Sequence, residues 1–206
     1  MSHPIIIVGA GAAGLMAAAE LVAAGRRVVV LERGKEPGRK ILASGGARCN
    51  LTHQADPEVF LAAFDRAAAR FLKHAVYDLP PEALRAWFAE RRVPTVVEAD
   101  GCVFPASHSS KDVLAALLRA AGVHALSLLR REGGRPVPSR VEGRPREGGA
   151  DLQLGVACQQ VLVETGRVVG VETSAGRLSA AAVILATGGP AWPKAGGSAG
   201  GFDLLS

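Results

Sequence analysis

Aromatic side chains are scarce in this chain of 206 residues, where Phe, Trp and Tyr together make up 4%. Aliphatic side chains must therefore supply most of the core, and 49% of all residues are hydrophobic. The same scarcity leaves the 24 lysines and arginines without interleaved rings on which bases could stack. Although the formal net charge is +5, we expect no nucleic acid as a partner.

Cysteine is also rare, and Cys49, Cys102 and Cys158 show no CxxC spacing. An odd number of unpaired cysteines argues against a disulfide framework and against a cysteine zinc site. The five histidines are isolated, and no HExxH, GxSxG or paired-carboxylate pattern occurs. We therefore predict no metal site and assign no catalytic residue from these patterns. The cysteine usage fits a reducing compartment, so a cytoplasmic location is expected.

Long apolar runs are missing too. No stretch approaches the roughly 18 apolar residues of a membrane-spanning helix. The N-terminal region lacks the basic segment, apolar segment and cleavage site of a signal peptide. We therefore expect no membrane partner.

The first 32 residues predict one β-α-β unit. Residues 5–8 form an apolar, β-branched run that is typical of a buried parallel strand. Residues 12–24 are rich in alanine and leucine and predict a helix that ends at Gly25. Residues 28–31 predict the second strand, which ends at Glu32. The right-handed crossover would place the helix against the sheet.

The middle of the chain predicts a loop followed by helices and a hairpin. The expected elements are a glycine-rich loop over 35–52, a helix starting near Pro57, a helix over 81–92, hairpin strands at 96–98 and 102–104, a helix over 111–121 and a strand over 123–129. The segment from about 130 to 149 holds six arginines, five glycines and three prolines, a composition that cannot build a core. We predict a solvated loop there rather than an anion-binding segment.

The last third of the chain predicts β-structure. An antiparallel β-meander is expected from about residue 152 to 180, because β-branched runs alternate with turn residues. Residues 182–186 then predict another buried strand, which ends at Thr187. We find no internal repeat.

The strongest motif is the turn between the first strand and the first helix. Gly9, Gly11 and Gly14 have the G-x-G-x-x-G spacing, which is weak alone and strong in this context. Gly9 permits the tight turn, Gly11 lets a pyrophosphate approach the backbone, and Gly14 allows close packing of helix and strand. The free amides at the helix start, including those of Ala12 and Ala13, favour phosphate.

Glu32 stands where a ribose-binding carboxylate is expected. It follows Gly14 by 18 residues (32 − 14) at the end of the second strand. A carboxylate there accepts hydrogen bonds from ribose hydroxyls and repels a 2′-phosphate, which favours FAD or NAD over NADP. The alternative is an ordinary strand–helix turn with a solvated acid. Dinucleotide binding is favoured because every element falls in its required place.

The loop Gly38-Arg-Lys-Ile-Leu-Ala-Ser-Gly-Gly-Ala-Arg-Cys-Asn-Leu-Thr52 resembles the signature loop of the BaiN/aminoacetone-oxidase-like FAD-dependent flavoproteins. The stretch at 101–107 with 111–114, and residues 186–189, resemble the same family. The resemblance implies an α/β, Rossmann-like FAD-binding domain with a parallel sheet and an antiparallel β-meander crossover. Ala47 departs from the family, which usually has a glycine there. The glycine-rich stretch 196–202 is a degraded version of the family's pattern.

The family resemblance and the residue chemistry together give a set of predicted cofactor contacts. Arg39 and Lys40 would neutralise the pyrophosphate, and Gly45 and Gly46 would let the backbone follow the ribityl chain or the ring. The full set is Gly9, Gly11, Ala12, Ala13, Gly14, Glu32, Arg33, Arg39, Lys40, Gly45, Gly46, Arg48, Cys49, Asn50, Val161, Ala186, Thr187 and Gly188.

Three residues of this set have open roles. Arg48 either stabilises the N1/O2 edge of reduced flavin or is a surface charge. Cys49 is either a redox thiol near the flavin or a packing residue, and packing is favoured because isolated cysteines mostly pack. Asn50 would hydrogen-bond the ribityl chain or the ring.

The resemblance also implies a longer chain, with a substrate domain and a final sheet strand. Residues 1–206 are therefore expected to be the N-terminal part of one FAD-binding domain, incomplete at the C-terminus. The implied activity is an FAD-dependent oxidoreductase that takes electrons from NAD(P)H and passes them to a small organic substrate or to oxygen. The alternative is a non-catalytic FAD-binding fragment, which a partner chain could complete.

Overall fold

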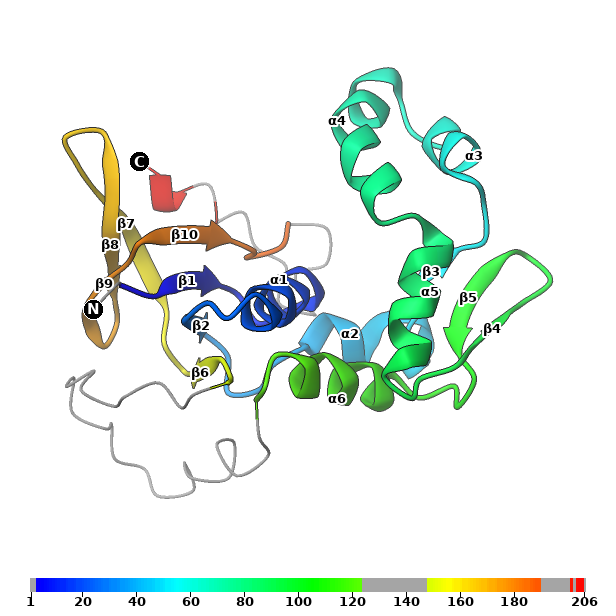
Figure 1. Cartoon of the computed structure of the whole chain (residues 1–206), viewed down its shortest axis with the longest axis horizontal. Coiled ribbons are helices and arrows are strands. Elements are labelled where there is room, and N and C mark those ends of the chain that lie inside the picture. The colour runs from blue at the N-terminus through cyan, green and yellow to red at the C-terminus, as the bar shows by residue number, and fades with distance from the viewer. Residues whose placement is uncertain (1–2, 124–147, 190–200, 202, 206) are drawn as a thin grey trace. The chain divides into compact units, whose positions relative to one another are not determined.

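The computed structural model describes residues 3–123, 148–189, 201 and 203–205, which divide into two compact units (Figure 1). One unit consists of Met1–Lys40 and Leu117–Ser206, and the other is the continuous segment Ile41–Ala116. The predicted strand over 123–129 and the predicted loop over 130–149 lie almost entirely outside the described residues.

The first unit is built on a four-stranded parallel sheet. Its strand order is β10-β1-β2-β6, so β10, which comes late in the sequence, lies beside β1, which comes first. The strands are β1 (Ile5–Val8), β2 (Val28–Glu32), β6 (Asp151–Leu154) and β10 (Ala182–Leu185). In register, Ile5 pairs with both Val28 and Ala182. The predicted α/β fold with a parallel sheet is confirmed.

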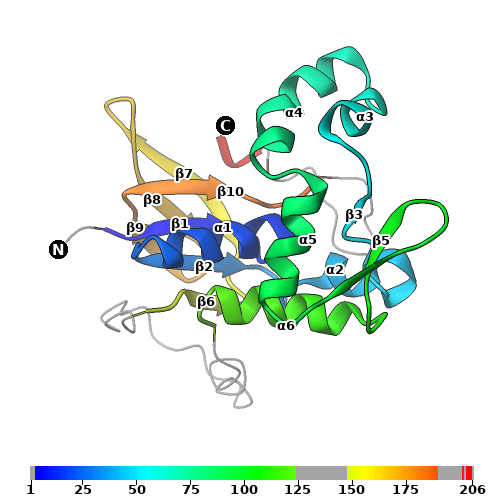
Figure 2. The same ribbon diagram turned by 45° about the vertical axis from the view of Figure 1, so that its right-hand side comes forward.

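Helix α1 (Ala12–Ala23) packs along β1 and β2 (Figure 2). Leu15 and Ala18 are fully buried on the helix face that meets the sheet. Gly14 makes this approach possible, since a Cβ there would overlap the Gly9 carbonyl oxygen and press on the Ile7 side chain. Burial of each large aliphatic side chain contributes about 1.5–3 kcal/mol to stability.

A three-stranded antiparallel meander covers the other face of the parallel sheet. It consists of β7 (Cys158–Glu164), β8 (Arg167–Thr173) and β9 (Gly176–Ser179). One core cluster joins the two sheets, and its buried members are Ile6, Val8, Val29, Leu31, Val156, Val161, Val171, Ala180 and Leu204. Leu204 belongs to a short 3₁₀ helix, Asp203–Leu205.

The predicted start of the meander, near residue 152, is wrong. Residues 151–154 form β6, which pairs in parallel with β2 and therefore belongs to the other sheet. Gly155, with a φ of +72°, lies where the chain changes direction between β6 and β7. The strand over 182–186 is also less buried than predicted. In β10, Ala182 is exposed and the other residues are half-buried, because β10 pairs only with β1 among the described residues.

The second unit combines helices with a small antiparallel sheet. The helices are α3 (Pro57–Ala62), α4 (Arg66–Asp78) and α5 (Pro81–Glu90). The strands, in the order β3-β5-β4, are β3 (Thr52–His53), β5 (Cys102–Pro105) and β4 (Thr95–Val97). The predicted hairpin is confirmed, since Val96 pairs with Phe104.

Two local features of the second unit differ from the sequence expectation. The helix expected from Pro57 is split, because the Asp65 carboxylate accepts the amides of Ala67 and Ala68 and starts α4 as a new helix. The loop expected over 35–52 contains α2 (Arg39–Ala43) and a 3₁₀ turn, Ser44–Ala47. With five and four residues, these segments are too short for the helical repeat of apolar residues to be visible in the sequence.

The division between the units falls within α2 and within α6 (Ser110–Ala120). Each of these helices therefore carries the chain from one unit to the other. Within the described ranges, no helix has the length and apolarity needed to cross a bilayer.

Candidate dinucleotide-binding site

The turn between β1 and α1 lies against the end of β10. Gly9 has a φ of +108°, a conformation that residues with a side chain rarely adopt. A Cβ at Gly9 would come within 2.5 Å of the Ala186 carbonyl oxygen and 3.2 Å of Thr187 Cα. The structure therefore brings together two segments that the sequence predicted separately as cofactor contacts.

Gly11 faces open space at the start of α1. Its φ of −85° and ψ of −170° are accessible to any residue, so backbone conformation does not require glycine here. A Cβ at Gly11 would meet no protein atom within 4 Å. Ala12 and Ala13 are exposed, and the first turn of α1 carries no acidic side chain. The positive end of the helix is therefore open to an anion.

The Glu32 carboxylate is fixed by two backbone amides. Oε2 accepts the Ala10 amide at 2.9 Å, and Oε1 accepts the Gly34 amide at 2.7 Å. A carboxylate offers about four lone-pair positions, so two remain for hydroxyl donors. Glu32 therefore holds the turn in place and keeps acceptor capacity for a ribose.

Residues 38–40 return the chain to the same turn. The Gly38 amide donates to the Ala10 carbonyl at 2.8 Å. Lys40 Nζ lies 3.4 Å from the Gly189 carbonyl oxygen and beside Gly188. Lys40, one of the two predicted cations, thus lies near the turn at Ala10 and the end of β10. The side chain of the other, Arg39, is exposed.

Two glycines of this group were not among the predicted contacts. Gly38 has a φ of +70°, and Gly201 lies so close to Thr187 that a Cβ would overlap Thr187 Oγ1. The family-like stretches around Gly38 and Gly201 were the available signals. Two further predicted contacts differ in burial: the Arg33 side chain is exposed, and the Val161 side chain lies in the core between the sheets, which leaves only its backbone for a ligand.

The other predicted contacts lie in the second unit, in a left-handed turn. Gly45, Gly46, Ala47 and Cys49 have φ values of 53°, 66°, 69° and 64°. Gly45 is packed closely, since a Cβ there would lie 3.0 Å from both the Asn50 amide nitrogen and the Phe104 ring. The family's usual glycine at position 47 thus has a physical basis, because Ala47 adopts a conformation that disfavours a side chain.

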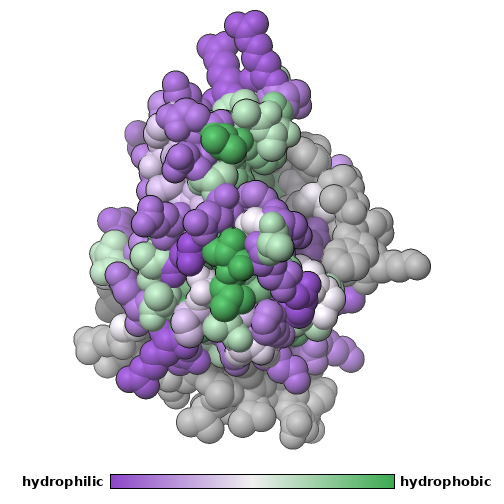
Figure 3. Space-filling view, turned by 90° about the vertical axis from the view of Figure 1, so that its right-hand side faces the viewer, coloured by the Kyte–Doolittle hydropathy of each residue, from purple (hydrophilic) through white to green (hydrophobic). Residues whose placement is uncertain are grey.

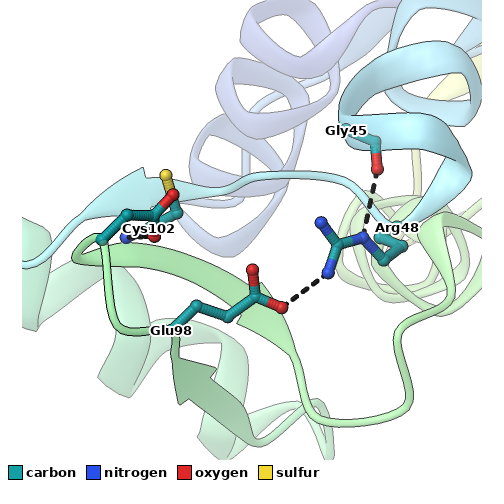
Figure 4. Close-up of polar contacts among 5 residues, drawn as sticks. Gly45, Arg48, Glu98 and Cys102 are labelled. Atoms are coloured by element: carbon teal, nitrogen blue, oxygen red, sulfur yellow. Dashed lines mark hydrogen bonds and ion pairs between the residues drawn. The ribbon is translucent and has the colours of Figure 1, made fainter.

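Arg48 is held by three contacts, and Figure 4 draws those with Glu98 and Gly45. Its Nη1 lies 2.5 Å from Glu98 Oε1, and its Nε donates to the Gly45 carbonyl at 3.4 Å. Its guanidinium carbon lies 4.1 Å from the centre of the Phe104 ring. The structure therefore shows an arginine paired with a carboxylate. No sequence signal marked Glu98, which is 50 residues away.

The two cysteines of the second unit are poor nucleophiles at neutral pH. Cys49 is 6% exposed, and burial raises the pKa of its thiol, while a hydrogen bond with Ser44 lowers it less. The pKa of Cys102 is raised chiefly by its hydrogen bond with Asp100, although Asn50 acts in the opposite direction. For Cys49 the burial favours the packing interpretation.

The fold and the residues of the first unit define a Rossmann-type dinucleotide-binding protein of the flavoprotein class. The sequence pattern of the "HI0933-like protein Rossmann domain" matches residues 3–143, and the chain belongs to this family. The predicted family and its cofactor are confirmed: the family is FAD-dependent, and FAD is the dinucleotide of this domain. The open space before Gly11 and the fixed Glu32 carboxylate fit such a group.

Two curated relatives match part of the chain. The ribosomal RNA dihydrouridine synthase of Escherichia coli K12 is 46% identical over 87 residues, which are 40% of this chain and 22% of that protein. The enzyme of the same name from Haemophilus influenzae is 58% identical over 48 residues, 23% of this chain and 12% of that protein. The chain thus matches less than a quarter of the length of either relative.

A solved structure shows the same fold. A flavocytochrome c3 fumarate reductase in an open conformation superposes with a TM-score of 0.61 at 18% identity, covering 92% of this chain and 34% of that one.

Proposed function

We propose that this chain is the FAD-binding part of an oxidoreductase that takes electrons from NAD(P)H and passes them to a second substrate. The observation that carries the proposal is the open space at Gly11, at the start of α1, whose first turn carries no acidic side chain, beside the Glu32 carboxylate. FAD supplies the hydride chemistry that protein side chains lack.

The residues of the first unit bind and orient the dinucleotide in this proposal. The α1 amides near Ala12 and Ala13 donate to the pyrophosphate, and Lys40 adds a positive charge near Gly189. Glu32 accepts hydrogen bonds from the ribose hydroxyls at the lone-pair positions that the Ala10 and Gly34 amides do not occupy. The close packing at Gly9 and Gly14 fixes these groups before binding, which lowers the entropic cost of binding.

In the second unit, the left-handed turn at Gly45 and Gly46 would expose backbone toward the ribityl chain or the ring. Arg48 has the charge to stabilise an anionic reduced ring. Because Glu98 neutralises part of that charge, the pair would stabilise the ring less than a free arginine would.

The first candidate for the electron acceptor is a small organic molecule or oxygen. A second candidate is a uridine base of RNA, supported by the two relatives named ribosomal RNA dihydrouridine synthase. Saturating the C5–C6 double bond of uracil takes one hydride and one proton, and NAD(P)H is oxidised to NAD(P)⁺ in balance. The relatives' names favour this candidate, although the composition of the chain alone predicted no nucleic acid.

The test uses the 206-residue chain with added FAD. Quenching of flavin fluorescence measures FAD binding, and bleaching of the flavin absorbance by NADH or NADPH without oxygen measures the electron donor. If the chain binds FAD but neither NADH nor NADPH bleaches the flavin absorbance, the proposed electron donor is wrong and the chain is an FAD-binding module. A chain that does not bind FAD contradicts the whole proposal. The Gly11→Ala variant is the control for binding at the predicted place.

A further inference from the structure

We infer that the exposed side of α4 is a docking surface for single-stranded RNA, with basic side chains on phosphates and Phe71 on a base. This inference rests on the RNA candidate of the proposed function. It concerns only the second unit, which contains the whole of α4.

Three basic residues of α4 lie on one side of the helix. Arg66, Arg70 and Lys73 are spaced four and three residues apart, so their side chains follow one another along the helix surface. All three are exposed. Lys73 Nζ lies 6.0 Å from the Tyr77 ring, which continues the same row by one more turn. The sequence showed arginines spread along the chain, whereas the helix gathers this subset into a row.

Phe71 flanks this row and is 85% exposed. A single exposed hydrophobic residue is common on protein surfaces, so Phe71 is informative here only because it stands beside the cations of the row. His74 lies between Phe71 and the row on the helix surface, because it follows Phe71 by three residues and Arg70 by four. Figure 3 shows hydrophobic residues next to hydrophilic ones on the face that it presents. An aromatic ring beside cations is the combination that single-stranded nucleic acid uses.

The side of α4 next to the row is its apolar side. Ala68, Ala69, Leu72 and Val76 are half-buried and form the apolar side of the helix, yet no residue of α3 or α4 is fully buried. Folding therefore buries only the apolar side of α4, and the basic row stays exposed.

Two acidic residues nearby, Asp65 and Glu58, accept local hydrogen bonds. Asp65 accepts two amides at the start of α4. Glu58 accepts the Tyr77 hydroxyl at 2.5 Å, and this hydrogen bond chiefly lowers the pKa of Glu58. Asp78 ends the helix on the Phe71 side. The row carries three cations, with the Glu58 carboxylate beside its Tyr77 end, and phosphate is complementary to this row. The carboxylates of Asp65 and Asp78 lie off the row, at the two ends of α4.

The experiment measures binding of a fluorescein-labelled, single-stranded oligouridylate by anisotropy, using the FAD-supplemented chain at several salt concentrations. Phe71→Ala should weaken binding about tenfold, the usual order for one stacked base, and Phe71→Trp should restore it. Arg66→Ala with Arg70→Ala should weaken binding and make the salt slope less negative by about 1.4, the value for two lost phosphates. The controls, Arg26→Ala and Val163→Ala, change exposed residues of the first unit and should bind as the wild type does.

Each outcome decides a separate point. If the wild type binds RNA and the α4 variants bind equally well, the docking surface is wrong while RNA remains the candidate substrate. If the wild type binds no RNA, both the RNA candidate and this surface fail, whereas FAD binding, measured in the same samples, still tests the rest of the proposed function. If phosphatidylglycerol vesicles, and not RNA, bind in a Phe71-dependent manner, the surface is a membrane-docking surface and the RNA inference is overturned.

Discussion

Glu32 Oε2 accepts a hydrogen bond from the Ala10 amide at 2.9 Å, which ties the end of β2 to the turn between β1 and α1. The two residues are 22 positions apart, and they meet because β1 and β2 are adjacent parallel strands. The same carboxylate also accepts the Gly34 amide. A residue that sequence patterns predict to be a ribose ligand is therefore also a structural element of the turn that we propose binds phosphate.

This double role predicts the effect of Glu32→Gln. The amide oxygen can accept only one of the two backbone donors well, and the NH₂ group would face the other donor. Charge-assisted hydrogen bonds contribute about 1.5–3 kcal/mol, so FAD affinity should fall by roughly ten- to a hundredfold. Flavin fluorescence titration measures the change. Glu36→Gln, in the following exposed loop, is the matched control and should bind FAD normally. Equal affinities for the two variants would contradict the role of Glu32.

Gly11 and Gly14 should respond differently to alanine. A Cβ on Gly14 overlaps the Gly9 carbonyl oxygen, so Gly14→Ala should destabilise the fold by about 1–3 kcal/mol. A Cβ on Gly11 meets no protein atom, so Gly11→Ala should leave the unfolding free energy within about 0.5 kcal/mol of wild type. The same methyl would enter the space assigned to the pyrophosphate, and FAD affinity should drop. Urea denaturation and FAD titration separate the two effects. A Gly11→Ala variant that binds FAD as tightly as wild type would place the pyrophosphate elsewhere.

The contrast between these glycines shows what the sequence could reveal. The β-α-β unit was predictable because its strands, helix and glycines follow one another within 32 residues and each has a local pattern. The Arg48–Glu98 pair was not predictable, because its partners are 50 residues apart and depend on the hairpin register. The pairing of β6 with β2 was missed for the same reason, since Asp151 meets Val29 across most of the chain.

Ala47→Gly should stabilise the protein modestly. Ala47 has a φ of 69°, where a Cβ costs roughly 1–2 kcal/mol relative to glycine. The greater freedom of glycine in the unfolded chain offsets about 0.4–1 kcal/mol of this gain. The expected net increase in unfolding free energy is therefore about 0.5–1 kcal/mol. Ala43→Gly is the control, because Ala43 has right-handed helical angles of −91° and −18° and the change should destabilise by a similar amount. Destabilisation by both changes would contradict the strain at Ala47.

The buried thiol of Cys49 should make the stability of the protein depend on alkaline pH. Burial raises the pKa of Cys49 in the folded state above its ordinary value of 9.0, because the thiolate is poorly solvated inside the protein. The unfolded chain thus releases this proton at a lower pH than the folded chain does. The contribution to stability is fully present below the ordinary pKa and is lost as pH rises through the folded pKa. Urea denaturation between neutral pH and about pH 10 should show a fall in the unfolding free energy, and Cys49→Ala should fall less steeply. Part of the decline should remain in this variant, because burial also raises the pKa of Cys158 and the hydrogen bond with Asp100 raises the pKa of Cys102. Parallel declines in the wild type and Cys49→Ala would show that Cys49 does not carry this pH dependence.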